Sequence, residues 1–214
     1  MKRKTLSILV FVLASTFAFN VQAQSWDTGA DIVSSYVWRG TKFGTGPAMQ
    51  PWAEYSTGGF AIGAWGSYGF TDDEAAEADL YASYGFDLGE GAALTLTVTD
   101  YYFPGSMYFD GDSHFFEPMI GLELGSFSFT GAYMTGDGVS DTYLEAGLAV
   151  GSVNLALGAG DGAYTMDGDF NVCNISVGTS KEIKITDTFS LPISGTAILN
   201  PSSEQFHIVV GISL

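Results

Sequence analysis

The sequence predicts an all-β fold: a transmembrane, antiparallel, up-and-down β-barrel of about twelve strands. Three observations predict it. Apolar and polar residues alternate with a period of two, in segments of about ten residues, as in strands with two different faces. Tight glycine turns alternate with longer acidic connections along the chain. Aromatic residues gather near the ends of the apolar faces, as they do at the two interfaces of a membrane barrel.

The alternation defines each strand and its two faces. In the last segment five apolar residues (Phe206, Ile208, Val210, Ile212, Leu214) alternate with Gln205, His207 and Ser213. The segment at 169–181 is the weakest, because its faces mix polar and apolar residues. The twelve predicted strands are 29–39, 48–57, 59–70, 77–87, 92–102, 114–125, 126–135, 141–151, 152–161, 169–181, 188–199 and 204–214.

The connections indicate which strand ends lie together. Tight turns are expected at "TGG" after 57, at Gly125-Ser126 and at Gly151-Ser152, because Gly-Ser between alternating runs favours a two-residue hairpin. The intervening connections are longer and acidic: "TDDEAAE", "FPGSMYFDGDS", "TGDGVSD" and "GDGAYTMDGD". A short-long rhythm places all the long loops at one end of the barrel.

The aromatic residues predict two belts. The upper belt would contain Tyr36, Trp38, Tyr68, Phe70, Tyr102 and Phe116, and the lower belt Tyr55, Phe60, Tyr84, Phe86, Phe127 and Phe129. The alternative is a soluble β-sandwich, whose outward faces should be polar and rich in lysine. Here the second faces carry glycine, threonine and acids with almost no lysine, which favours the barrel. Closure also leaves no unpaired strand edge in lipid.

The N-terminal segment, residues 1–23, is predicted to be a cleaved signal peptide. A basic start "MKRK" precedes the apolar run "LSILVFVLASTFAF", and small residues precede Gln24. Residues 24–214 would then form one barrel domain. The lone cysteine, Cys173, can form no internal disulfide. Four Lys/Arg remain against 24 Asp/Glu, a formal charge of −20, and this excludes nucleic acid as a partner because phosphate binding needs a basic surface.

One stretch near the N-terminus carries a family resemblance. "VSSYVWRGTKFGTGPAMQPWAEYSTGGFAIGAWGS" resembles the N-terminal region of the TorF-type porin family of Gram-negative outer-membrane proteins, whose functions are largely unassigned. The points of similarity are Ser35-Tyr36, Arg39-Gly40, Pro47-Ala48, Gln50, Tyr55, Gly63 and Trp65-Gly66-Ser67. "EADLYASYGF" and "LTVTDYYFPG" are similar to the strands that follow, so the resemblance covers about residues 28–105. It implies an outer-membrane barrel and a pore, and it carries over no catalytic residue.

The inward faces carry most of the candidate site residues. These faces place six acidic side chains and one clear cation, Arg39, in the lumen. The residues predicted to line the pore are Asp31, Ser35, Arg39, Trp52, Glu54, Trp65, Asp79, Tyr81, Tyr101, Glu117, Glu123, Glu145 and His207. These acids either keep a polar wall solvated or form a cation-favouring path. Eight-stranded barrels are filled by side chains and sixteen-stranded barrels are open. Twelve strands predict a narrow or partly obstructed lumen.

Arg39 is expected to end the first strand, on its inward face at the outer mouth, with Lys42 in the first external loop. Candidate partners are Glu54 on the next strand and Glu204 near the closing strand. The pattern leaves open whether Arg39 makes a wall salt bridge or contacts a solute.

The sequence gives little support for an enzyme active site or a dedicated metal site. Ser113 and His114 are adjacent in the chain, and adjacent strand residues point to opposite faces, so they are no nucleophile–base couple. "DGD" at 110–112 and "DGDF" at 167–170 lack the spacing of a calcium loop. They either hold divalent cations loosely, bridging to lipopolysaccharide phosphates, or only solvate the loops. No cofactor is expected.

The function these patterns favour is a narrow, porin-like diffusion pore for small polar or cationic solutes. It would lie in the outer membrane of a Gram-negative bacterium, in contact with outer-membrane lipid and lipopolysaccharide. The first alternative is a closed structural or adhesive barrel that acts through its acidic extracellular loops. The second is an outer-membrane enzyme with a site facing the lipid.

Overall fold

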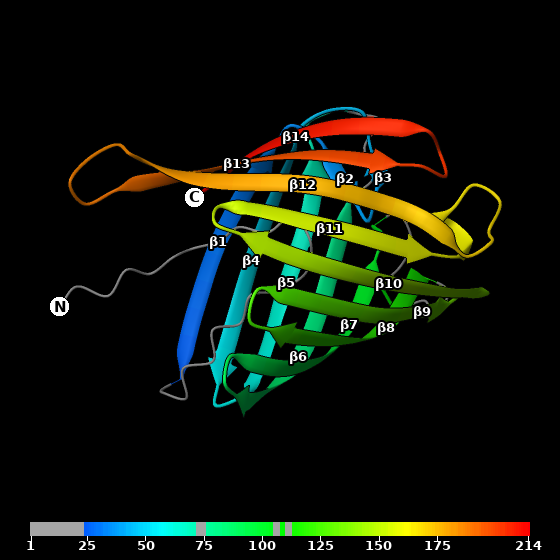
Figure 1. Ribbon diagram of the computed structural model, residues 1–214, viewed down its shortest axis with the longest axis horizontal. Coiled ribbons are helices and arrows are strands. Elements are labelled where there is room, and N and C mark those ends of the chain that lie inside the picture. Colours follow the sequence, from blue (N-terminus) through cyan, green and yellow to red (C-terminus); the bar gives the residue numbers. More distant parts are fainter. Residues whose placement is uncertain (1–23, 72–75, 105–107, 110–112) are drawn as a thin grey trace.

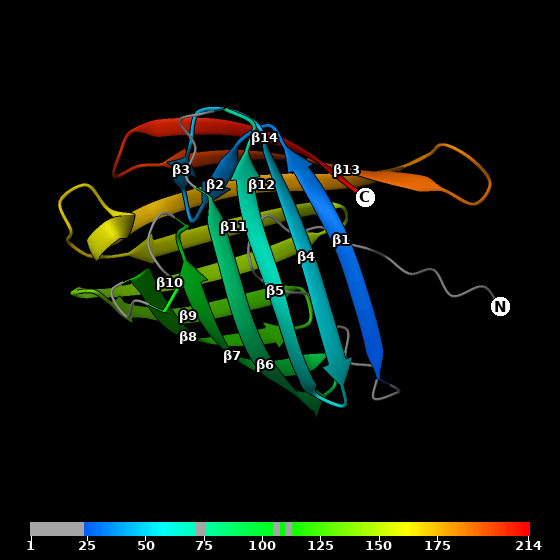
Figure 2. The ribbon, with the colours of Figure 1, turned by 180° about the vertical axis from the view of Figure 1, so that it is seen from behind.

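The structure, a computed structural model, describes residues 24–71, 76–104, 108–109 and 113–214. The predicted signal peptide, most of "TDDEAAE" and the "DGD" run at 110–112 lie outside these residues. Twelve antiparallel strands close into one barrel, in which β1 pairs with both β14 and β4 (Figures 1 and 2). Within the described residues, no helix is long and apolar enough to cross a membrane.

The wall strands run in sequence order around the barrel. They are β1 (Ser25–Val33), β4 (Ala48–Thr57), β5 (Phe60–Gly69), β6 (Glu77–Gly89), β7 (Ala92–Tyr102), β8 (His114–Leu124), β9 (Phe127–Gly136), β10 (Val139–Val150), β11 (Val153–Gly160), β12 (Asn171–Lys184), β13 (Ser190–Asn200) and β14 (Gln205–Ser213). The predicted number is confirmed, and all strands but the first begin and end within about three residues of their predicted limits. The period-two pattern therefore located the wall well.

The first predicted strand, 29–39, is wrong in its second half. The wall strand is β1, which begins earlier and ends at Val33. The chain bends at Ser34 and Ser35, and β2 (Tyr36–Trp38) pairs with β3 (Thr41–Phe43) in a separate two-stranded sheet. Its turn residues Arg39 and Gly40 have φ of 50° and 83°. Positive φ at both turn positions is the geometry of a type I′ hairpin, and we call residues 36–43 the inner hairpin.

The inner hairpin lies inside the barrel. Val37 packs in one apolar cluster with Val33, Ala48, Ile198 and Val209, which come from β1, β4, β13 and β14. The cluster anchors the hairpin to this side of the wall. Figures 1 and 2 place β2 and β3 toward the end of the barrel that carries the longer loops.

The outward face carries a broad apolar band, with charged residues exposed at the strand ends. Exposed aromatic side chains lie near one end of the strands (Tyr68, Phe70, Phe116) and near the other (Phe60, Tyr84, Phe86, Phe127, Phe129). Tyr36 and Trp38 do not belong to the upper belt, because the inner hairpin carries them into the barrel. An apolar band between two aromatic belts is the outer surface of a transmembrane barrel.

The two ends of the barrel depart from the predicted short-long rhythm in two places. "TGDGVSD" is no long loop, because β9 and β10 are joined by Asp137 and Gly138 alone, both with positive φ. At the opposite end, β12 and β13 run past their neighbours. Pairing of β12 with β11 ends at Thr179, and pairing of β13 with β14 begins at Ile193, so beyond these two residues β12 and β13 pair only with each other. In Figure 1 this extension projects to the left, past the C-terminus.

Candidate functional site: a buried arginine cluster in the lumen

Arg39, at the tip of the inner hairpin, forms a two-point ion pair with Glu117 of β8. Its Nη1 lies 2.5 Å from Glu117 Oε1, and its Nη2 lies 3.0 Å from Oε2. The Tyr101 hydroxyl donates to Oε2 at 2.9 Å. Arg39 is 8% exposed and Glu117 1% exposed. The hairpin tip is therefore fixed to the wall opposite its anchor by a buried, charge-assisted contact.

Aromatic rings surround the guanidinium. The Arg39 Cζ atom lies 4.4 Å from the ring centre of Trp38 and 4.3 Å from that of Tyr143 on β10. Arg39 Nη1 also donates to the hydroxyl of Tyr164 at 2.6 Å. Tyr164 belongs to a short 3₁₀ helix, η2 (Gly162–Tyr164), in the connection between β11 and β12. Cation–π contacts strengthen when they are desolvated, so these rings help to hold the charge in place.

The charge state of Arg39 follows from its surroundings. Burial lowers the pKa of its guanidinium, but the nearby Glu117 carboxylate raises it by more, and the net result is a pKa above its usual range. Arg39 therefore stays protonated, as arginine does in proteins generally.

A second polar network lies beside the cluster. The Tyr143 hydroxyl donates to Glu145 Oε2 at 2.5 Å, and Asn174 Nδ2 donates to the same oxygen at 2.9 Å. Asn200 Nδ2 donates to the carbonyl of Gly40 at 3.3 Å. These bonds join the hairpin tip to β13 and β10 to β12.

Two backbone features let the tip come so close to the wall. A Cβ atom added at Gly40 would overlap the carbonyl oxygen of Cys173 on β12. The Cys173 side chain is itself fully buried, in an apolar cluster with Tyr143 and Tyr164 against which Trp38 packs. Gly40 is thus needed both for its positive φ and for this contact.

The part of the lumen nearer the short turns holds a separate acid. Glu54 accepts a hydrogen bond from the Tyr81 hydroxyl at 2.9 Å. Tyr81 crosses β5 at Gly63, where a Cβ atom would overlap its hydroxyl. Glu54 and Glu123 are both half-buried, unlike the acids around the inner hairpin.

The structure brings some of the predicted pore-lining residues together and separates others. Arg39, Tyr101 and Glu117 meet in one cluster. Ser35 is buried in the link before the inner hairpin, and Trp65 contacts the Tyr36 ring with centres 5.6 Å apart. Glu145 joins the neighbouring network through Tyr143, and Asp79 pairs with Tyr101 across β6 and β7. The remaining predicted residues lie on other parts of the inward face: Asp31, Trp52, Glu54, Tyr81, Glu123 and His207. Their role as pore-lining residues stays a prediction.

The prediction of where Arg39 lies and which residue it pairs with is wrong. Arg39 does not end a wall strand, and its partner is Glu117 rather than Glu54 or Glu204. Lys42 lies on β3 of the inner hairpin, not in an external loop. The sequence analysis also missed Tyr143 and Tyr164. Tyr143 shares the face of Glu145 two residues on, so the alternation could have placed it inward, whereas nothing in the pattern singles out Tyr164.

His114 lies outside the lumen cluster. Its Nδ1 lies 2.7 Å from Asp100 Oδ1, and its Nε2 contacts the carbonyl oxygen of Tyr108. Both ring nitrogens are thus engaged by groups other than a nucleophile. Among the described residues, no group of three or more His, Cys, Asp or Glu is arranged to hold a metal ion.

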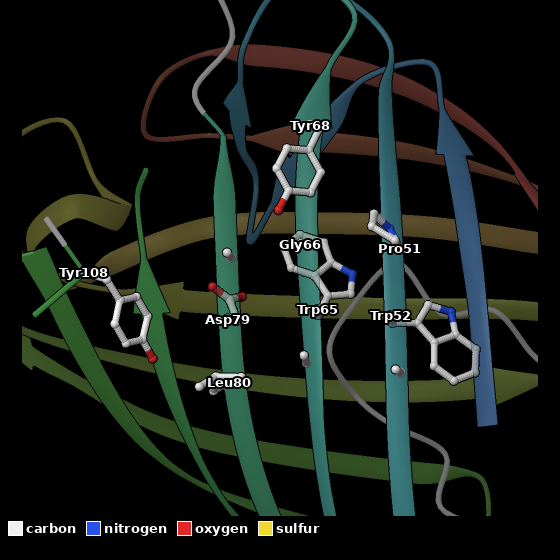
Figure 3. A pocket seen from close by; sticks show the side chains of 11 residues that line it. Pro51, Trp52, Trp65, Gly66, Tyr68, Asp79, Leu80 and Tyr108 are labelled. Carbon is white, nitrogen blue, oxygen red and sulfur yellow. The ribbon is translucent and has the colours of Figure 1, made fainter. Parts of the chain in front are cut away.

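A hollow of about 390 Å³ lies over β4, β5 and β6 (Figure 3). Small residues line it (Pro51, Ala53, Ala64, Gly66, Ala78), together with Tyr68, Leu80, Tyr108, Trp52, Trp65 and Asp79. The β4–β5 register is interrupted here, between the pairs Met49–Tyr68 and Trp52–Trp65, where Pro51 has no N–H to donate. The hollow is mostly apolar and offers no constellation for chemistry.

No family model matches the chain, and no curated protein matches it. Among solved structures, the crystal structure of Pseudomonas aeruginosa OprD is similar at a TM-score of 0.40 and 12% identity, covering 88% of this chain and 66% of that chain. A crystal structure of a double variant of OccD1 (OprD) is similar at a TM-score of 0.39 and 13% identity, covering 88% and 65%. The chain thus spans just under two thirds of the length of either structure. The resemblance to the TorF-type family stays a prediction from the residues quoted above.

Proposed function

We propose that the protein is an outer-membrane, porin-like barrel in which the inner hairpin forms the constriction. The proposed solutes are small and polar or cationic. The closed wall, the apolar outward face and the polar inward residues support a barrel in a membrane. The predicted signal peptide supports export to the outer membrane of a Gram-negative cell.

The observation that carries the proposal is the docking of Arg39 on Glu117. Wall side chains fill an eight-stranded barrel, but twelve strands enclose more space. Here a segment that leaves the wall occupies the outer part of that space and is fixed on both sides, by the Val37 cluster and by the ion pair. A buried ion pair is weak evidence for stability, because desolvation offsets its attraction. We therefore assign it a positioning role: it sets where the hairpin tip sits and so how wide the remaining passage is.

Charge supports a preference for cations. Glu117 neutralises Arg39, and the other inward acids have no such partner among the ion pairs of the described residues. The remaining Lys/Arg residues, Lys42, Lys181 and Lys184, are all exposed, and the last two lie on the β12–β13 extension. A lumen with low-dielectric walls and mainly acidic side chains concentrates cations.

The alternative of a closed structural or adhesive barrel also has an observation in its favour. The Arg39 cluster is buried and its polar groups are satisfied, as in a barrel sealed at this level. We propose a non-enzymatic role in either case, in keeping with the engaged ring nitrogens of His114.

Conductance in planar bilayers tests the proposal. Wild-type protein is expected to give small, cation-selective channels, and Arg39→Ala to give larger ones, because the hairpin tip loses its attachment. Lys42→Ala is the matched control: it removes the other cation of the hairpin, which is exposed and has no ion pair among the described residues. Silent bilayers with folded wild type and folded Arg39→Ala would refute the pore and leave the closed barrel.

A further inference from the structure

The groups that surround the Arg39 side chain come mostly from outside the inner hairpin. Glu117 of β8 contacts the guanidinium with both carboxylate oxygens, and the Tyr101 hydroxyl of β7 donates to one of them. The ring centre of Tyr143 on β10 lies 4.3 Å from Arg39 Cζ, and the Tyr164 hydroxyl of η2 accepts a hydrogen bond from Nη1 at 2.6 Å. Glu117 and these three tyrosines form what we call the guanidinium box. The barrel supplies the box, and the hairpin supplies its occupant.

The guanidinium box matches the shape of a guanidinium group as well as its charge. A carboxylate that presents both oxygens fits the planar fork of a guanidinium, whereas an ammonium group is a compact point charge without that fork. Aromatic rings stack on the flat face of a guanidinium, and the box presents the Tyr143 ring to it. A small solute that carries a guanidinium group would therefore find the same contacts in the box that Arg39 makes.

Arg39 fills the guanidinium box from a segment that is not part of the wall. β2 and β3 pair with each other in a sheet separate from the closed barrel. Arg39 is also the only arginine after the predicted signal peptide, so no other residue in 24–214 can offer a guanidinium. Glu117 is 1% exposed, and a buried carboxylate without a positive partner is costly. Whenever the hairpin tip leaves, the box is left with an unpaired charge that a guanidinium from solution can neutralise.

We propose that the guanidinium box is a binding site for solutes that carry a guanidinium group, and that the protein's own Arg39 keeps it closed. A bound solute would take the place of the Arg39 head group and keep the hairpin tip away from Glu117, so the docking of Arg39 is an autoinhibitory contact. A tethered group acts at an effective concentration on the order of millimolar or higher, so a solute must reach a comparable concentration to compete. The inference deepens the proposed function and rests on the hairpin being the constriction, but binding at the box requires no conduction.

Labelling of Cys173 with a maleimide tests the site, because this thiol is fully buried in a cluster against which Trp38 of the hairpin packs. Methylguanidinium chloride is the probe, and methylammonium chloride at the same concentration controls for charge and ionic strength. In the wild type the solute should favour the undocked hairpin, and labelling should rise about tenfold when its concentration is ten times the dissociation constant of the box. In Arg39→Ala the solute should fill the empty box beneath the hairpin, and labelling should fall by about tenfold, because Glu117 is neutralised again. Methylammonium should change neither rate.

The opposite directions of the two responses separate binding from denaturation, because a denaturant would speed labelling in both proteins. Arg39→Ala/Glu117→Gln should lose the response to methylguanidinium, and Lys42→Ala should respond like the wild type. Labelling of Arg39→Ala that methylguanidinium leaves unchanged or speeds up would overturn the site, and so would an equal response to methylammonium.

The outcomes also separate the site from the pore. Both responses in a protein that gives no current would refute the pore and support the site, whereas current without these responses would refute the site alone. If Arg39→Ala does not fold, the wild type decides: a rise with methylguanidinium and none with methylammonium supports the site, and the absence of that rise overturns it.

Discussion

Removing the Arg39 side chain should release the inner hairpin. In the Arg39→Ala variant, Glu117 keeps the Tyr101 hydroxyl but loses both guanidinium contacts at a position that is 1% exposed. Removing one partner of a buried ion pair typically costs about 3–5 kcal/mol, because the remaining charge is left uncompensated. The barrel wall does not depend on this contact, so the cost falls on the docked state of the hairpin. Since every 1.4 kcal/mol is roughly a factor of ten, undocking should become about a hundred to a few thousand times more frequent.

Cys173 provides a natural probe of undocking. It is the only cysteine, it is fully buried, and Trp38 of the hairpin packs against its cluster. A maleimide reagent reaches the thiol only when the hairpin leaves. When undocking and redocking are fast relative to labelling, the labelling rate of folded protein follows the open population. The expected increase for Arg39→Ala is therefore about two to three powers of ten over the wild type.

Two further variants make the measurement specific. Lys42→Ala should label at the wild-type rate. The double variant Arg39→Ala/Glu117→Gln should label more slowly than Arg39→Ala, because the uncompensated charge is gone, and the difference measures the coupling between the two residues. Equal labelling of the wild type and Arg39→Ala, with both correctly folded, would show that the ion pair does not hold the hairpin.

Three other outcomes are expected. Gly40→Ala should also expose Cys173 to labelling, because the added Cβ overlaps the Cys173 carbonyl and φ at Gly40 is +83°. Labelling at the slow wild-type rate would count against the docked geometry. Glu54→Gln should lower the cation preference of the channel, measured as the reversal potential under a salt gradient. The change should be modest, because charges in water interact by only about 1 kcal/mol at contact distance. An unchanged potential would show that Glu54 does not line the path of the ions. An epitope tag at Asp137 should be reached by antibody on intact cells and a tag at Gly151 should not, since the two turns lie at opposite ends of the barrel; the reverse pattern would invert the proposed orientation.

The wall of the barrel could be predicted from sequence because it depends on local information. Period-two alternation fixes which residues share a face, and glycine turns fix where each strand ends. Glu117 was placed inward for this reason alone. The errors at the first strand and at Arg39 share one cause. The alternation in "YVWRGTKF" fits a wall strand and an inner hairpin equally well, and only tertiary packing decides between the two structures.

The partner of Arg39 could not be predicted for a related reason. Glu117 lies 78 residues further along the chain, and the contact exists only because the hairpin leaves the wall. The Arg39-Gly40 pair between two short alternating runs was the available signal for a hairpin, although Asn-Gly or Asp-Gly is the usual sequence there. Tyr164 lies in a connection without periodicity, so its approach to the cluster depends on how η2 folds over the lumen.

The β12–β13 extension has a consequence for how the protein behaves among its own copies. Beyond Thr179 and before Ile193 both strands leave their outer backbone groups unpaired, and such an edge can recruit a strand from another chain. The exposed apolar side chains Ile183 and Ile185 would favour that self-association. Lysines and a proline lie along the same edges, Lys181 and Lys184 on one strand and Pro192 on the other, and charged side chains and proline are the usual means by which proteins blunt free edges. The few lysines of this acidic chain thus protect it from strand-to-strand aggregation where the wall ends.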